Sequence, residues 1–490
     1  MSSPRLRAAA RVWRARTARR RADRGYFAYL LVMVAITAIA PVARMLWLRA
    51  TGPLGSTLLT SAGLPWFLVL VAIVFWAGAL LVGSYRGPTL RSPSLLHALL
   101  SSDLRYSESL RGALVRAATL TLLVTAAVAG FTGAALLHLG LESVAGVLVL
   151  LVAACAVGVI ATLCGLIGQA HPRAATSVGL IALAAVAAAA VTVIPTPTLN
   201  PSGHFLAVGA AGLIAVAATL AAFTPQMLNG LGYERLMQQA TNWNAAVTFS
   251  STLDFSLAAT VYQERPRVGR RLSAVRELRS LPLVFLLRDA VGLLRTPGRL
   301  LGAVGASTAV GVLVSLSVAA PEFRMLLSAG AALLLYLAAG ALGQGMRHAA
   351  QVAADYPLFG LSGRKLVAYH CVFPLVSAVT LVTGANVATA LTTGIPMWGP
   401  VLNGLTLTLL ILAIRLGAAL RGPLPPRLLA PIESPAGDLS IIVQLAWAFE
   451  APLVALLSGM ALALLPLTPL PLLAAVTWVT VSCVIRWRHR

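Results

Sequence analysis

The sequence predicts an all-α polytopic membrane protein of about twelve transmembrane helices, arranged as two six-helix repeats, each preceded by an amphipathic interfacial helix. Three observations lead to this fold class. The 490 residues are 59% hydrophobic and only 10% charged, whereas about a quarter of the residues of a soluble domain are charged. Apolar runs long enough to cross a bilayer recur along the whole chain. Arginine-rich segments follow every second run.

A transmembrane helix needs about 20 apolar residues to cross about 30 Å of hydrocarbon. This criterion predicts spans at 27–47, 64–84, 114–138, 143–168, 175–194, 204–223, 300–319, 325–346, 368–391, 397–420, 440–462 and 467–487. The first run is long and no small-residue cleavage site follows it, so we interpret it as a retained span and not as a signal peptide.

Arginines decide the predicted orientation of these spans. They are dense in alternate connecting segments and sparse in the others, which hold residues such as Arg49 and Arg324. By the positive-inside rule, the arginine-rich segments and both termini lie in the cytoplasm. The net charge of +23 fits anionic lipids and not nucleic acid, because the arginines lie between apolar runs. We therefore expect a multi-pass protein of the cytoplasmic (inner) membrane that binds anionic lipids and no nucleic acid.

The layout of the chain predicts a two-fold internal repeat. Residues 1–223 form a first six-span half, 224–282 a cytoplasmic linker and 283–490 a second six-span half. An arginine-rich amphipathic segment precedes each half, at 5–22 and at 283–299. We expect both segments to lie in the membrane interface.

The second of these lead-in segments shows its two faces in the sequence. Its arginines fall on one helical face and its apolar residues on another: Arg288, Arg295 and Arg299 against Leu287, Val291 and Leu294. Pro297 is expected to stop this helix and let the chain turn into span seven.

An inner polar segment follows the second span of each half, at 92–118 and 351–370. Each combines an acid, a tyrosine, a serine-containing turn and basic residues before the chain re-enters the membrane. The residues expected to contact a partner are Leu99, Leu100, Asp103, Arg105, Tyr106 and Arg111 in the first segment, and Asp355, Tyr356, Phe359, Arg364 and Lys365 in the second. Short polar helices of this kind suit a groove on a cytoplasmic protein.

An interfacial helix, six spans and a short inner segment of the L-S-x-x-R-L type resemble the permease subunits of ABC exporters of the ABC-2 type. In layout the chain is similar to the fused twelve-span permease-like proteins of actinobacteria. The resemblance implies that 5–22 and 283–299 are elbow helices, and that 99–112 and 355–367 are coupling helices contacting two cytoplasmic ATPase subunits. Since ABC-2 permeases are commonly six-span homodimers, a fused chain would need no second copy to form the pore.

Nothing in the sequence provides ATP binding or metal chemistry. The P-loop motif G-x-x-x-x-G-K-[ST] requires a lysine, and the only lysine, Lys365, lies in GLSGRKLVAYH. ATP and Mg²⁺ are therefore expected on the partner ATPase, with no cofactor in this chain. No two of the seven histidines are three or four residues apart, and the four cysteines show no C-x-x-C spacing. We expect a transport subunit and not an enzyme.

Glu450 lies inside the apolar run IIVQLAWAFEAPLVALL, and an ionisable residue within a membrane segment is a candidate functional residue. With Gln444 at helical spacing, it predicts a polar translocation path. Asn386 and Asn403 are weaker candidates for the same path, since interhelical hydrogen bonding explains most lone asparagines. The alternative for Glu450 is structural, as the partner of a residue such as Arg415 in span ten.

Three classes of protein compete for this sequence: the permease subunit, an ion-coupled secondary transporter that uses Glu450, and a membrane-embedded enzyme acting on lipid-linked substrates. A secondary transporter favours intramembrane acids in matching positions of both halves, and Glu450 has no counterpart in span five. An enzyme of the third class would carry acids or histidines on sizeable outer loops, which are mostly short and nearly uncharged here. The permease subunit is the favoured interpretation.

Overall fold

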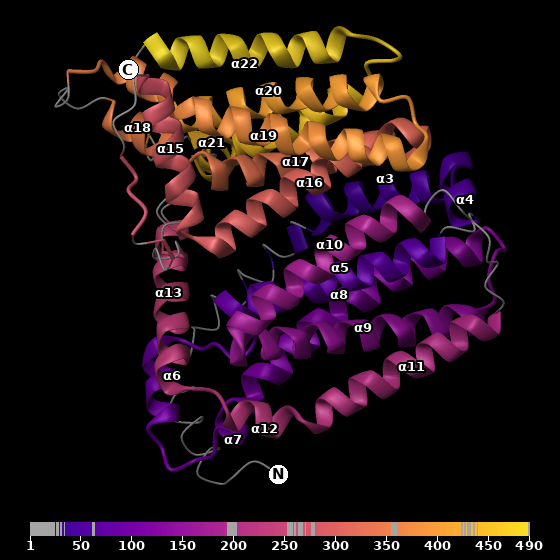
Figure 1. The fold of residues 1–490 in the computed structure, drawn as a ribbon. Helices are drawn as coiled ribbons and strands as arrows, with labels where there is room; N and C mark the ends of the chain where they lie inside the picture. Colours follow the sequence, from indigo (N-terminus) through magenta and orange to yellow (C-terminus); the bar gives the residue numbers. More distant parts are fainter. Residues whose placement is uncertain are drawn as a thin grey trace. The chain divides into compact units, whose positions relative to one another are not determined.

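The computed structural model describes residues 35–60, 64–193, 203–251, 280–353, 360–422 and 440–488, with isolated positions between these ranges. The predicted lead-in segment at 5–22 and most of the predicted linker beyond residue 251 lie outside the described residues. The chain divides into two compact units, one formed by 1–182 and 196–244 and the other by 183–195 and 245–490. Figure 1 shows the helices of both units.

Unit 1 consists of helices only within its described residues. They are the π-helical turn η1 (Ala35–Ile39), α3 (Ala40–Ala50), α4 (Pro53–Leu59), α5 (Leu64–Tyr85), α6 (Pro93–Leu100), α7 (Tyr106–Ser109), α8 (Arg111–His138), α9 (Val144–Ala170), α10 (Pro172–Val193), α11 (Gly203–Ala222), α12 (Thr224–Asn229) and α13 (Tyr233–Ser251). Helices α10 and α13 begin in unit 1 and end in residues that are counted with unit 2.

Within its described residues, unit 2 is also helical apart from one short hairpin. Its elements are α15 (Leu281–Leu294), α16 (Pro297–Ala319), the 3₁₀ turn η2 (Pro321–Phe323), α17 (Arg324–Leu342), α18 (Gln344–Val352), α19 (Gly363–Thr393), α20 (Trp398–Leu420), α21 (Ser440–Ala463) and α22 (Leu470–Arg488), with strands β1 (Glu433–Ser434) and β2 (Gly437–Asp438) between α20 and α21. The two strands pair antiparallel.

Nine of the described helices are long and apolar enough to cross a membrane, which confirms an all-α multi-pass membrane protein. They are 68–85, 111–138, 144–170, 297–319, 324–342, 363–393, 398–420, 443–463 and 470–488. Of the other three predicted spans, 204–223 appears as a shorter apolar helix at Val208–Ala222. The described part of 27–47 forms η1 and α3, and 175–194 coincides with α10. The count of twelve stays a prediction.

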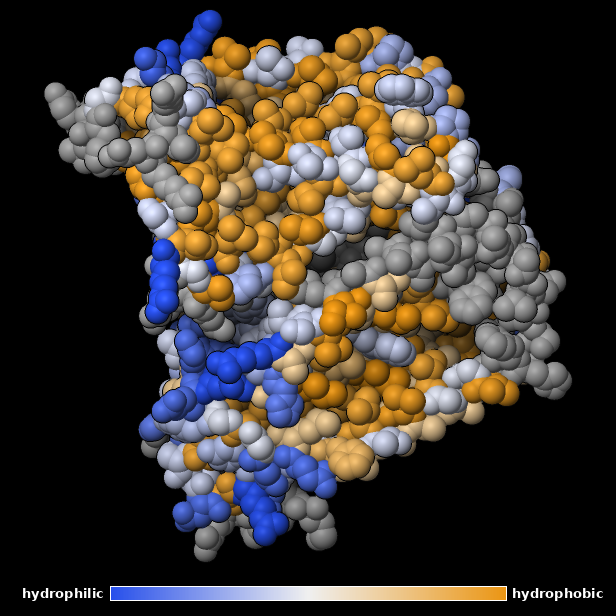
Figure 2. All heavy atoms as spheres, in the orientation of Figure 1, coloured by the Kyte–Doolittle hydropathy of each residue, from blue (hydrophilic) through white to orange (hydrophobic). Residues whose placement is uncertain are grey.

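The surface of these helices suits a lipid environment. On α8, Leu120, Val124 and Val128 are spaced one turn apart, and each keeps 61–66% of its surface exposed. Exposed large apolar side chains on a continuous helical stripe are costly in water and favourable in hydrocarbon. Figure 2 shows hydrophobic residues along the lengths of the helices and hydrophilic residues gathered toward their ends.

Helices α5 and α9 of unit 1 approach each other at glycines. A Cβ atom on Gly83 would lie 2.1 Å from the carbonyl oxygen of Gly165, and one on Gly168 would lie 2.2 Å from that of Leu80. Small residues allow membrane helices to pack backbone against backbone. In addition, the Trp76 indole N–H donates to the Val157 carbonyl across the same pair of helices, at 3.1 Å.

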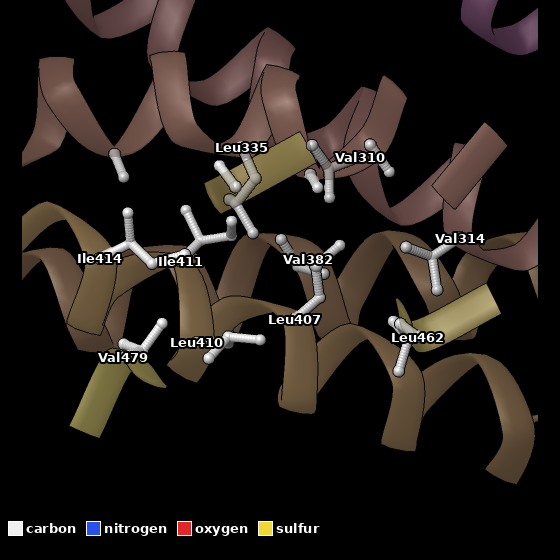
Figure 3. Packing of buried hydrophobic residues seen from close by; sticks show 14 of the residues in the cluster. Val310, Val314, Leu335, Val382, Leu407, Leu410, Ile411, Ile414, Leu462 and Val479 are labelled. Atoms are coloured by element: carbon white, nitrogen blue, oxygen red, sulfur yellow. The ribbon is translucent and has the colours of Figure 1, made fainter. Parts of the chain in front are cut away.

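The core of unit 2 lies between α16, α17, α19, α20, α21 and α22 (Figure 3). Its most buried large residues include Val310, Leu335, Val382, Leu407 and Ile411, each at most 1% exposed. These five residues come from α16, α17, α19 and α20, and α21 and α22 add further residues to the same cluster. Because six helices meet in this core, it fixes the rotation of each helix about its own axis.

The chain breaks between α15 and α16 at the predicted place, but one prediction about this break is wrong. Pro297 is the first residue of α16, where its missing N–H is harmless. Arg299 therefore belongs to α16 and does not continue the arginine face of α15. Its Nε donates to the Ala341 carbonyl at 2.8 Å, which ties α16 to the end of α17.

Candidate functional site

The first candidate site is a cap of four helices, α6, α7, α12 and α13, at the end of unit 1 where α8 begins and α9 ends. Residues from the cap and from these span ends form one buried cluster: Leu96, Leu100, Leu110, Leu114, Leu166, Leu228, Leu231, Leu236 and Ala240. Burial of each leucine side chain contributes about 1.5–3 kcal/mol. The cap is thus held firmly on the span ends.

A chain of buried amides also holds the cap. The Thr89 hydroxyl donates to Gln169 Oε1 at 2.9 Å, and Gln169 Nε2 donates to Gln239 Oε1 at 2.9 Å. Gln239 Nε2 in turn donates to the carbonyl of Ser84, at 3.0 Å. Thr89 and Gln169 are fully buried, and Gln239 is 6% exposed. Since a buried amide without a partner is costly, this chain fixes α13 against the ends of α5 and α9.

Aromatic and basic side chains tie the outer part of the cap. His97 on α6 lies 2.7 Å from the Tyr233 hydroxyl on α13. The Arg86 guanidinium, just after α5, lies 3.4 Å from the centre of the Trp243 ring. Arg235 donates to the Ala170 carbonyl at the end of α9, at 2.6 Å. Most of the described part of the predicted linker is therefore packed on unit 1.

The predicted partner-contact residues of the first inner segment divide into buried anchors and exposed charges. Leu100 is buried, while Leu99 and Tyr106 are half-buried. The charged side chains of this segment are exposed: Asp103, Arg105 and Arg111. The backbone N–H of Ser107 donates to Asn229 Oδ1 at 2.9 Å, so that α12 supports α7. The segment thus presents a charged face on a rigid base.

The second inner segment is described only in part. Asp355, Tyr356 and Phe359 lie outside the described residues. Arg364 and Lys365 are exposed and occupy the first turn of α19. Ser362 caps this helix, because its hydroxyl accepts a hydrogen bond from the Lys365 N–H. Both basic side chains therefore extend from a helix end that is itself anchored.

Glu450, in the middle of α21, is bound to the ends of two neighbouring helices. Its carboxylate binds Arg421, just after α20, at 2.9 Å, and Arg486, near the end of α22, at 2.7 Å. The Arg421 guanidinium also lies 3.8 Å from the centre of the Trp447 ring. Burial lowers the pKa of Arg421, and Glu450 acts in the opposite direction. Glu450 itself lies within the candidate membrane span Val443–Ala463, and the two arginines reach it from the ends of α20 and α22.

The other residues of the predicted translocation path are not brought to Glu450. Arg415, its suggested partner, donates instead to the Tyr336 carbonyl at 2.7 Å and lies over the Tyr336 ring. Gln444 donates to the Leu428 carbonyl at 2.9 Å. Asn386 is fully buried and accepts a hydrogen bond from Ser315 at 3.0 Å, and Asn403 is half-buried on α20. These residues form separate contacts and not one continuous path.

Sequence reasoning missed a polar cluster between α15 and α19. His370 is 1% exposed, and its Nδ1 lies 2.7 Å from Asp289 Oδ2. Its Nε2 lies 3.2 Å from Arg288 Nη1. A guanidinium only donates, so Nε2 accepts and Nδ1–H donates to the carboxylate. In the sequence, the clue to this cluster was Asp289, the one acid of the amphipathic segment that became α15. Its partner His370 is 81 residues away, so the sequence could not show that the two meet.

Close packing around Asp289 requires a glycine at position 345. A Cβ atom on Gly345, at the start of α18, would lie 2.2 Å from Asp289 Oδ2, so only glycine fits there without a rearrangement. Phe285 packs edge-on against the His370 ring, with ring centroids 4.8 Å apart. The cluster therefore joins α15, α18 and α19 at one point. Among the described residues, no group of three His, Cys, Asp or Glu side chains is placed to hold a metal ion.

Comparison with known proteins gives a family but no relative of known activity. No curated protein and no solved structure matches the chain. A family model described as a family of unknown function, DUF6297, matches residues 57–422. This match begins in α4 and ends just after α20, so it includes the cap of unit 1 and the His370 cluster but not Glu450. Because the match spans about three quarters of the sequence, the chain belongs to the DUF6297 family.

Proposed function

We propose that this protein is the membrane-spanning permease subunit of an ATP-driven exporter and moves a substrate across the cytoplasmic membrane with a separate ATPase. In this proposal the chain has twelve spans in two six-span repeats, and both termini are cytoplasmic. The resemblance to ABC-2 permeases suggests two ATPase subunits, one for each half. ATP and Mg²⁺ bind to those subunits, because this chain has no P-loop.

The observation that carries the proposal is the construction of the cap on unit 1. A segment that transmits force from a partner has to be rigid and has to expose a specific face. The cap combines both properties, since its leucines and the Thr89–Gln169–Gln239 chain are buried while Asp103, Arg105 and Arg111 are exposed. A flexible loop with the same charges would bind a partner without moving the spans.

Three helix pairings that are common to the two units support the repeat. In unit 1, α9 packs against α5, α8 and α11. In unit 2, α20 packs against α17, α19 and α22, and also against α16 and α21. Counted along the proposed halves, the fourth span contacts the second, the third and the sixth in both units, and the contacts of α20 with α16 and α21 have no counterpart among those of α9. A short helical segment also lies between the second and third span of each half, α6–α7 in one and α18 in the other.

The ion pairs of Glu450 argue against an ion-coupled mechanism through this residue. A carrier carboxylate has to exchange its bound ion during each cycle. Binding of a proton to Glu450 would instead break its contacts to both Arg421 and Arg486, and leave two guanidinium groups close together without a counter-charge. The geometry fits a structural tie between α20, α21 and α22.

The test is co-purification with an ABC ATPase encoded beside this protein, together with ATP hydrolysis by the complex. We expect Arg105→Glu combined with Arg364→Glu to release or uncouple the ATPase, because both side chains are exposed at arginine-bearing helix ends. The membrane protein itself should stay folded, as judged by size-exclusion chromatography. Each single variant should show a smaller effect if both halves hold an ATPase.

Arg173→Glu is the matched control, since Arg173 is exposed at the start of α10, outside the two inner segments. It reverses the same charge and should leave binding and hydrolysis unchanged. Equal loss of binding in the control would indicate a general electrostatic attraction and contradict these contacts. Failure of any ATPase to co-purify with the native protein would reject the proposed function and favour a secondary transporter.

A further inference from the structure

A cavity of about 420 Å³ lies at the arginine-bearing end of unit 2, and its described lining includes no residue of the Glu450 ion pairs or of the His370 cluster. Four helix ends surround it. Its lining residues are Ala353 after α18, Ser362, Gly363, Arg364 and Val367 at the start of α19, Leu420 at the end of α20, and Trp487 near the end of α22.

The cavity is amphipathic. Its apolar part belongs to a buried cluster in which Val367 is 1% and Leu420 is 4% exposed. Its polar side carries the exposed Arg364 and the Ser362 cap of α19. Trp487 is half-buried and supplies an indole ring, a group enriched at membrane–water interfaces. A ligand that fits these walls has an anionic group beside an apolar body.

The surrounding charge also favours an anion. Around the cavity, the described residues at this end of unit 2 are mainly basic: Arg347, Arg364, Lys365, Arg421, Arg486 and Arg488. The acid among them, Glu450, is bound by Arg421 and Arg486. Two more acids, Glu433 and Asp438, lie on the hairpin between α20 and α21. Among the described residues at this end of unit 2, basic side chains thus outnumber acids.

The position of the cavity favours a lipid headgroup over a soluble anion. The cavity is formed where α19, α20 and α22, which are long and apolar enough to cross a membrane, begin or end. We therefore infer that it lies near the level of the lipid phosphates. A lipid in the adjacent leaflet reaches this level without leaving the membrane, and its acyl chains can pack on the apolar lining of the cavity. A small soluble anion has no apolar part and cannot make these contacts.

We propose that this cavity is a binding site for an anionic phospholipid, with the headgroup phosphate at Arg364 and the start of its acyl chains against Val367, Leu420 and Trp487. The general attraction of arginines to anionic membranes does not require a cavity. The proposed site adds a defined position, a defined arginine and selection by headgroup. It needs only membrane embedding and does not rest on the proposed transport function.

The experiment measures quenching of Trp487 by brominated lipids. The purified chain is reconstituted without an ATPase into phosphatidylcholine vesicles that contain increasing fractions of dibrominated phosphatidylglycerol. The Trp487 signal is the difference between each protein and its Trp487→Phe counterpart, which removes the contribution of the other tryptophans. We expect half-maximal quenching at a lower fraction of brominated phosphatidylglycerol than of brominated phosphatidylcholine.

Arg364→Gln should raise the half-maximal fraction by about five- to tenfold, the effect of losing one arginine contact to a lipid phosphate. Lys365→Gln is the matched control, because it removes the same charge from the neighbouring residue, which does not line the cavity. Equal shifts for the two variants would indicate diffuse surface attraction and overturn the proposal. Equal quenching by both brominated lipids would overturn it as well.

A further measurement distinguishes the lipid from free phosphate. Inorganic phosphate is added to the vesicles at constant ionic strength, with chloride as the reference anion. Quenching by brominated phosphatidylglycerol should be the same in both buffers. Displacement of the lipid by phosphate alone would show a site for soluble anions and refute a phospholipid site. Because no ATPase is present, a failure here is distinct from a failure of the proposed exporter.

Discussion

Replacement of Glu450 by glutamine removes the negative charge through which α21 binds Arg421, just after α20, and Arg486 of α22. The variant keeps the shape of the side chain but cannot balance the charges of Arg421 and Arg486. These lie 2.9 and 2.7 Å from the carboxylate. We expect the free energy of unfolding of unit 2 to fall, because two guanidinium groups remain without their counter-charge.

The size of this effect follows from the contacts and their exposure. Removal of one partner from a buried ion pair costs about 3–5 kcal/mol. The three side chains keep 13–26% of their surface exposed, so water screens part of the repulsion and we expect about 2–4 kcal/mol. In a unit of this size, a loss of 1 kcal/mol lowers the unfolding temperature by about 2–4 °C. The expected decrease is thus about 5–15 °C.

The assay is thermal unfolding in lipid nanodiscs, followed by tryptophan fluorescence, to which Trp447 beside Arg421 contributes. Glu108→Gln is the control, since Glu108 is exposed on unit 1. The double variant Glu450→Gln with Arg486→Gln should regain part of the lost stability, because it removes one uncompensated charge. If Glu450→Gln unfolds at the same temperature as Glu108→Gln, the structural interpretation of Glu450 is wrong.

Three further substitutions test other contacts. His370→Ala should cost about 2–4 kcal/mol and speed amide hydrogen exchange first in α15, because it removes a buried polar contact of this helix; uniform acceleration across unit 2 would contradict this. Gly83→Leu should abolish the peak of folded protein in size-exclusion chromatography, because the new side chain would clash with the Gly165 carbonyl. Gly78→Leu is the control and should be tolerated, because no atom lies near the position of its Cβ. Gln239→Leu should cost about 1–3 kcal/mol and make α13 more sensitive to limited proteolysis; unchanged cleavage of α13 would show that the amide chain does not hold it.

The membrane class and the helix break at Pro297 were predictable because both depend on local sequence. An apolar run of about 20 residues has one low-energy solution in a bilayer, a helix that satisfies its own backbone. A proline cannot continue the helix that precedes it, and it is favoured at the first position of the helix that follows. Neither property depends on distant residues.

The support of the first inner segment was not predictable. The charges of Asp103, Arg105 and Arg111 could be expected at the surface, and they are exposed. The leucines that hold this segment belong partly to α12 and α13, which follow it by more than 100 residues and which the sequence presented as part of a linker. Apolar positions in a short polar helix show that something covers them, but not which part of the chain does so.

The partners of Glu450 show the same limit in physical terms. Its place in an apolar run was enough, by itself, to predict that this carboxylate contacts other polar groups and not lipid. The sequence offered Arg415 of α20 as a partner, yet Arg421, just after the end of this helix, pairs with Glu450. Six residues turn a helix by about 240° and advance it by about 9 Å, so the choice between the two arginines depends on how α20 is rotated and shifted against α21. That rotation is decided only by the tertiary structure, where the core residues of six helices interlock in one arrangement.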